Sequence, residues 1–316
     1  MNRVQTYSRC RRLALFVFPI VFPIVAIGLA PGDSRSAPFL YSVSPIDTNL
    51  RLIDAVDGST VQVIPLSGPG ADQMTGLAID PTSQGAADPE TWAAYGIART
   101  GDGVARNLVT INLVTGATTI VGNTGVAMAG LTFAPDGTLY GVSGDGGPAP
   151  NESLFTVSKL DGSAALLGSM GAGGDGEAIG YNSHDGLIYH FSGLRETEPI
   201  GREIFESINP ANGATVTTIL PEGTPDAEEG LALLYRGGGE FYASFLREDS
   251  DPTVGENLFA IIDTAGTVTK LGHFDHRSKG LAFAFVPEPS CLAMLLPSLL
   301  GITLFRRRFV RTPDSA

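Results

Sequence analysis

The sequence has only two cysteines, Cys10 and Cys291, and both lie near the ends of the chain. Residues 38–286 therefore have neither a disulfide nor a thiol nucleophile, and their fold must be held by its core. Basic residues are also scarce, since 20 Lys and Arg face 33 Asp and Glu, for a net charge of −13. This acidity excludes nucleic acid and anionic membrane surfaces as natural partners, whereas cations and neutral glycans suit it better.

The chain begins with a basic segment followed by an apolar one. Arg3, Arg9, Arg11 and Arg12 precede an apolar stretch from Leu13 to Ala30. This order is typical of a secretory signal, so we expect residues 1–37 to be a signal peptide and the rest to be exported. Cleavage near Ala30 or after Ala37 both remain possible.

The other end has three parts in a fixed order. Pro287, Glu288 and Pro289 precede an apolar run at 291–305, and Arg306, Arg307 and Arg308 follow it. The order resembles the PEP-CTERM sorting signal of bacteria that make extracellular polysaccharide. The resemblance implies an exosortase-type membrane protease as partner, transient anchoring in the inner membrane by a transmembrane segment, and a final place at the cell surface or in the extracellular matrix. An ordinary C-terminal membrane anchor is the alternative, but it does not explain Pro-Glu-Pro.

Between these ends a Gly-Leu-Ala-like motif occurs five times, at intervals of 46 to 54 residues. A second glycine precedes each motif. Short β-rich runs with alternating hydrophobicity lie between the motifs, which gives four strands per repeat. Four-stranded units at this period predict an all-β chain that resembles a β-propeller. The motif glycines are Gly76, Gly130, Gly176, Gly230 and Gly280; the second glycines are Gly58, Gly116, Gly162, Gly213 and Gly266.

The strand count predicts how the ring closes. We label the strands of a blade A to D outward from the motif strand. The chain opens with B, C and D strands at Phe39–Val43, Leu50–Asp54 and Thr60–Ile64, and ends with an A strand at Gly280–Phe285. Together they complete a fifth blade and leave no exposed sheet edge. An open array or a two-sheet sandwich is the alternative.

Acidic residues occupy four of the five D–A loops, which should surround one mouth of the central channel. Converging carboxylates favour a hard cation such as calcium. The alternative is that these are solvated charges on a very acidic protein. The predicted metal ligands are Asp72, Asp175, Glu177, Asp226, Glu228, Glu229 and Asp275.

Signals for catalysis are few. The segment from His273 to His276 could give zinc two or three ligands, although a structural or incidental role fits such a loop pair better. His184 and His190 are expected on the surface. Gly171–Gly176 matches a dinucleotide-binding pattern, but no helix follows it, so the match is discarded.

The sequence therefore favours a non-enzymatic binding or structural module at the cell surface. A calcium-dependent propeller hydrolase or lactonase is the main alternative. A purely structural biofilm component without any site is a third possibility.

Overall fold

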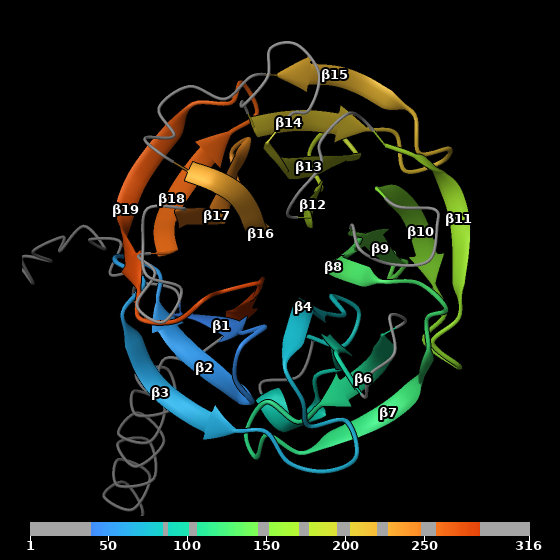
Figure 1. Cartoon of the computed structure of the whole chain (residues 1–316), viewed down its shortest axis with the longest axis vertical. Coiled ribbons are helices and arrows are strands. Elements are labelled where there is room, and N and C mark those ends of the chain that lie inside the picture. Colours follow the sequence, from blue (N-terminus) through green and yellow to red (C-terminus); the bar gives the residue numbers. More distant parts are fainter. Residues whose placement is uncertain are drawn as a thin grey trace, which may run out of the picture. The chain divides into compact units, whose positions relative to one another are not determined.

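The computed structural model describes residues 39–84, 88–100, 106–144, 152–170, 177–194, 203–219, 227–247 and 257–284. Within these ranges the chain forms twenty strands in five four-stranded antiparallel sheets, arranged as the blades of a ring (Figure 1). This confirms the all-β, five-bladed propeller. The predicted signal peptide and the sorting segment at 287–316 lie outside the described residues. Among those described, no helix is long and apolar enough to cross a membrane.

Each blade runs outward from one innermost strand. Blade 1 consists of β20 (Gly280–Ala284), β1 (Phe39–Val43), β2 (Asn49–Asp54) and β3 (Thr60–Pro65). Blade 2 consists of β4 (Met74–Ile79), β5 (Ala94–Ala98), β6 (Asn107–Ile111) and β7 (Thr118–Asn123), with a 3₁₀ turn at Pro89–Thr91. Blade 3 consists of β8 (Met128–Phe133), β9 (Leu139–Ser143), β10 (Ser153–Val157) and β11 (Ala164–Ser169). Blade 4 consists of β12 (Glu177–Asn182), β13 (Leu187–Leu194), β14 (Glu203–Ile208) and β15 (Thr215–Ile219). Blade 5 consists of β16 (Ala227–Gly237), β17 (Glu240–Arg247), β18 (Asn257–Asp263) and β19 (Val268–Phe274).

The ring closes where the sequence predicts. Strand β1 pairs antiparallel with β20, with Phe39 opposite Ala284 and Val43 opposite Gly280. The first and last described residues are therefore neighbours in one sheet. Strand β1 is paired with β20 on one side and with β2 on the other. The closure therefore leaves neither edge of β1 unpaired.

The core lies between neighbouring blades, whose sheets stack face to face. Between blades 4 and 5 it is aromatic: Phe191, Phe205, Phe241 and Phe245 are fully buried. The rings of Phe191 and Phe245 meet edge to face, with centroids 4.8 Å apart. Such pairs contribute about 0.5–1.5 kcal/mol beyond the burial of their area.

The repeated glycines allow blades to approach backbone to backbone. On the innermost strands, a Cβ on Gly280 would lie 2.6 Å from the backbone nitrogen of Leu77. At the periphery, the turn between a C and a D strand meets the outer strand of the preceding blade. There Gly162 has φ = 76°, and a Cβ on it would lie 2.5 Å from the oxygen of Gly122. Side chains at these positions would force the blades apart.

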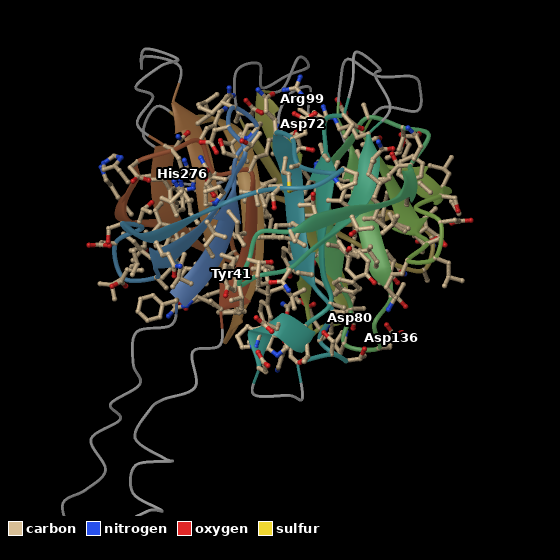
Figure 2. All side chains as sticks on the ribbon, turned by 90° about the horizontal axis from the view of Figure 1, so that it is seen from below. Tyr41, Asp72, Asp80, Arg99, Asp136 and His276 are labelled. Atoms are coloured by element: carbon tan, nitrogen blue, oxygen red, sulfur yellow. The ribbon has the colours of Figure 1, made fainter. Side chains whose placement is uncertain are left out.

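The two ends of the channel differ. The A–B and C–D turns share one face, which we call the turn face, and the B–C and D–A connections share the opposite loop face. Figure 2 shows Asp80 and Asp136 on the turn face and Asp72 and Arg99 on the loop face. The ring closure places Phe39 and Ala284 at the turn face, because β20 ends there and β1 begins there.

Candidate functional site

The loop-face carboxylates are only partly described. Asp175 and Asp226 lie outside the described residues, and for Glu177 and Glu228 only the place in β12 and β16 is given. Asp72 is half-buried and accepts a hydrogen bond of 2.7 Å from the backbone N–H of Gln73. In the described part of the chain, no three His, Cys, Asp or Glu side chains are grouped so as to hold a metal ion.

Glu229, at the start of β16, is neutralised by two basic residues of the last D–A loop. Its Oε2 accepts from Arg277 at 3.1 Å and its Oε1 from Lys279 at 3.0 Å. Arg277 lies three residues and Lys279 one residue before the fifth motif glycine, so both belong to the same loop as the predicted acids of the other blades. A cation bound by Glu229 would have to replace these partners.

Asp275 faces an outer strand. Its Oδ1 accepts a hydrogen bond of 2.7 Å from the Thr60 hydroxyl, and Thr60 begins the outermost strand β3. Figure 2 shows the neighbouring His276 well apart from Asp72. Calcium binding by the loop-face acids stays a prediction, which a rise in melting temperature beyond that given by sodium at equal ionic strength would test.

His276 connects Asp275 to the first strand of the chain. Its Nδ1 lies 2.9 Å from Asp275 Oδ1, and its Nε2 lies 2.7 Å from the hydroxyl of Ser42 in β1. This is the hydrogen-bond order of a serine nucleophile with its base and orienting acid. However, Ser42 is fully buried inside its sheet, so no substrate can reach its hydroxyl. Ser278 makes a further bond to Ser42 at 2.8 Å, and the cluster instead ties the last loop to the N-terminal strand.

We expect this cluster to make stability depend on pH. Burial lowers the pKa of His276, and Arg51 adds to this, while the carboxylates of Asp275 and Asp47 oppose it. As the pH falls through about 6.5, the unfolded chain takes up the imidazole proton before the native state does. The free energy of unfolding should therefore fall from pH 7.5 to pH 5.5, measured by urea denaturation.

Two histidine variants identify the source of this slope. His276→Asn should be less stable than the wild type at pH 7.5, and its free energy of unfolding should depend less on pH. His184→Asn, a change at an exposed turn residue, should keep the wild-type slope. A wild-type slope in His276→Asn would contradict the assignment.

The prediction that His190 is a surface residue is wrong. It lies in β13, where its side chain is 1% exposed, and its Nδ1 lies 3.0 Å from Oε1 of the equally buried Glu206 in β14. Thr215 donates to the other carboxylate oxygen at 3.0 Å. His190 and Glu206 are opposite residues of paired strands, which the sequence position alone did not show.

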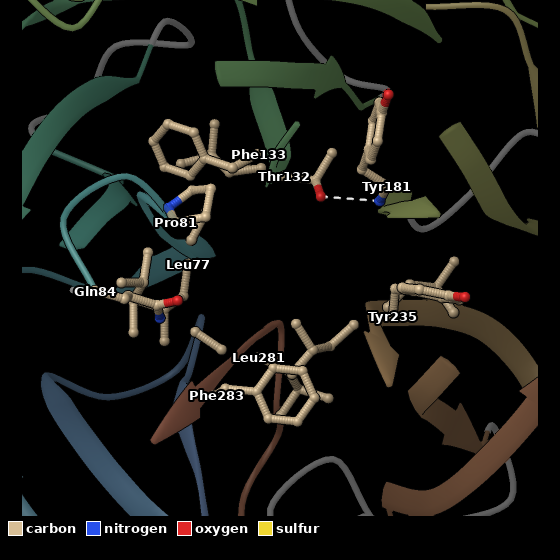
Figure 3. A pocket seen from close by; sticks show the side chains of 15 residues that line it. Leu77, Pro81, Gln84, Thr132, Phe133, Tyr181, Tyr235, Leu281 and Phe283 are labelled. Atoms are coloured by element: carbon tan, nitrogen blue, oxygen red, sulfur yellow. Dashed lines mark hydrogen bonds between the residues drawn. The ribbon is translucent and has the colours of Figure 1, made fainter. Parts of the chain in front are cut away.

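The channel has a cavity at the turn face, which we call the turn-face cavity. Its volume is about 160 Å³. Every blade contributes to the wall through its innermost strand or the turn that follows (Figure 3). Four of the five blades supply an aromatic ring, and blade 2 supplies Pro81 and Gln84 instead. The four rings, all half-buried, belong to Phe133, Tyr181, Tyr235 and Phe283.

A second aromatic ring supports each of these four. Tyr95 lies 5.8 Å from Phe133 and Tyr140 lies 6.4 Å from Tyr181, measured between ring centroids. The corresponding partner of Tyr235 is Phe241, at 5.2 Å, and that of Phe283 is Tyr242 from the neighbouring blade, at 6.2 Å. The lining rings are therefore held by packing.

Leu77, Leu131, Leu233 and Leu281 line this cavity and also a smaller one of about 10 Å³ further along the innermost strands. None of the loop-face carboxylates lines the turn-face cavity, so the two are separate candidate sites. The sequence carried a signal for the cavity, since its aromatic residues lie three or five positions after a motif glycine.

The rim of the turn-face cavity is acidic. The charges of Asp136 and Asp185 add to burial in raising the pKa of Tyr181. Lys159 is paired with Asp80 at 2.6 Å, and its Nζ lies 5.5 Å from the centroid of the Phe133 ring. A rim ring thus already attracts a cation. Arg236 is likewise paired with Glu240, at 2.8 Å.

Comparison with known proteins finds matches only among solved structures. No family model and no curated protein matches this chain. A protein of unknown function from Bacteroides caccae is 12% identical, with a TM-score of 0.49 over 78% of this chain and 99% of the other. A structure of the nidogen/laminin complex is 12% identical, with a TM-score of 0.48 over 79% and 99%. A gluconolactonase from Xanthomonas campestris is 13% identical, with a TM-score of 0.44 over 77% and 79%. At these identities and TM-scores the similarities carry no argument about function.

Proposed function

We propose that this chain is exported, sorted to the cell surface by an exosortase-type protease, and displayed there as a propeller that acts as a binding or structural module. The sequence supports export through its basic and apolar N-terminal segment, and sorting through Pro287, Glu288 and Pro289 with the arginines that follow. The acidity of the chain suits an extracellular module that binds cations or neutral glycans.

One observation carries the proposal. The propeller begins at Phe39 and ends at Ala284, and these two residues face each other across one strand pair at the turn face. The proposed signal peptide and sorting segment would thus join the ring at neighbouring residues, and removing either would break none of the described strand pairs. An anchor attached there would leave the loop face, with the B–C and D–A connections, on the side away from the attachment point.

Sorting gives the first test. In the bacterium that makes this protein, the surface form should lack the residues after about Pro289. Replacing Pro287, Glu288 and Pro289 by alanine should leave the tail attached, because the protease loses its recognition segment. Mass spectrometry of the surface fraction measures both results.

A control separates recognition from anchoring. Replacing Arg306, Arg307 and Arg308 by glutamine keeps the recognition segment and removes the basic stop. This variant should lose membrane retention, while Pro287 to Pro289 remain available for cleavage. Intact tails on wild-type surface protein would contradict the proposal.

A further inference from the structure

We propose that the turn-face cavity binds a quaternary ammonium group, the cationic part of molecules such as choline. The inference rests on the proposed function only in treating the propeller as a binding module; export and sorting are not used. The site is the channel mouth between Phe133, Tyr181, Tyr235 and Phe283, where leucines of the innermost strands also line the cavity.

The wall of the cavity has the chemistry that such a group needs. Aromatic rings attract cations through the negative potential of their faces, and quaternary ammonium groups are a recurrent ligand of such walls. The four rings come from four different blades of one rigid ring, and a second aromatic ring packs on each. Binding therefore does not have to order them, which lowers its cost. At about 160 Å³ the cavity has room for a small organic group.

The charges around the mouth favour a cation over an anion. Four carboxylates lie near this mouth, and in the described part of the chain only two basic side chains, Lys159 and Arg236, form ion pairs with them, although Lys159 also acts on Asp136. Asp80 is paired with Lys159, and Glu240 with Arg236. Asp136 and Asp185 act on the Tyr181 hydroxyl as negative charges. Four carboxylates against two basic side chains leave this mouth negative, so an anionic ligand would be repelled.

The scarcity of hydrogen-bonding groups favours a quaternary ammonium over a sugar or a primary amine. Polar side chains of the lining are few, and two of them are already engaged. Thr132 accepts from the backbone N–H of Tyr181 at 3.0 Å, and the Tyr235 hydroxyl accepts from Gly239 N–H at 3.4 Å. Besides the donor hydrogens of these two hydroxyls, only Gln84 and the Tyr181 hydroxyl offer polar side-chain groups, so a sugar or an ammonium would replace only part of its hydrogen bonds to water. A quaternary ammonium has no N–H to satisfy, and its methyl groups can pack on the leucines.

Calorimetry with choline chloride on the purified full-length chain tests the site. Choline and tetramethylammonium should bind saturably with one site per chain. The neutral analogue 3,3-dimethylbutan-1-ol, which has the shape of choline without its charge, should bind at least about tenfold more weakly. Sodium chloride at equal ionic strength and glucose should show no saturable binding.

Leucine variants keep the apolar volume and remove one ring at a time. Tyr181→Leu, Tyr235→Leu and Phe283→Leu should each weaken choline binding by about three- to thirtyfold. Phe39→Leu is the matched control, because Phe39 lies on the strand next to β20 at the same face but does not line the cavity. It should leave the affinity unchanged.

A separate experiment asks whether the quaternary ammonium group belongs to a lipid headgroup or to free choline. Dihexanoyl phosphatidylcholine below its micelle concentration tests a lipid headgroup against free choline, and binding of either supports the site. Equal binding of the neutral analogue, no saturable binding of any quaternary ammonium, or full affinity in all three leucine variants would overturn it. Because this assay needs no export, its failure is distinguishable from failure of the sorting test.

Discussion

Deleting residues 39–66 should abolish cooperative folding. The deletion removes β1, β2 and β3, and leaves β20 as the only strand of blade 1. It also removes Leu40 and Ile53, both fully buried in the core cluster that includes Phe259 of blade 5. The remaining chain would expose two blade faces, which invites aggregation. Urea denaturation followed by circular dichroism, with light scattering, measures the result.

Two further variants make this test sharper. Removing residues 1–37 alone leaves every described strand in place, so its unfolding transition should match that of the full chain. Leu40→Ala keeps β1 but creates a cavity at the closure, and should lower the free energy of unfolding by about 2–5 kcal/mol. A deletion of 39–66 that stays soluble and unfolds in a single transition would contradict the closed ring.

The architecture could be predicted because the sequence pattern of each repeat indicates where its own strands lie. Periodic glycines marked where the blades meet, and the missing A strand at the start matched the extra A strand at the end. The predicted strand at Phe39–Val43 has the same bounds as β1, and the one at Thr60–Ile64 begins where β3 does. These features are local or periodic, so the order of residues along the chain is enough to find them.

The site was harder to predict, because it depends on contacts between blades. Arg277 lies 48 residues from Glu229 in sequence, and Ser42 lies 234 residues from His276. Counting acids in the D–A loops showed neither the basic partners of Glu229 nor the outward position of Asp275. His190 was misplaced for a related reason, since a polar residue opposite Glu206 is buried only once both strands pair. The turn-face cavity likewise forms only when aromatic residues of four repeats converge.

Gly122→Ala should be strongly destabilising, although Gly122 is half-exposed. A Cβ at this outer-strand position would lie 1.8 Å from the backbone oxygen of Asp161 in blade 3. Backbone atoms cannot move aside as a flexible side chain does, so blades 2 and 3 would have to separate. Overpacking typically costs about 1–3 kcal/mol, and we expect about 3 kcal/mol here, measured by urea denaturation.

Two other glycines separate the clash from backbone strain. Gly125 is exposed and has φ = 76°, but a Cβ there would meet nothing within 4 Å. Gly125→Ala should therefore lower the free energy of unfolding only by the strain of alanine in the left-handed conformation, about 1–2 kcal/mol. At the junction of blades 5 and 1, a Cβ on Gly272 would lie 2.0 Å from the oxygen of Asp57, so Gly272→Ala should resemble Gly122→Ala. If both cost no more than Gly125→Ala, the blades have room between their outer strands, and the repeated glycines have to be explained by turn conformation alone.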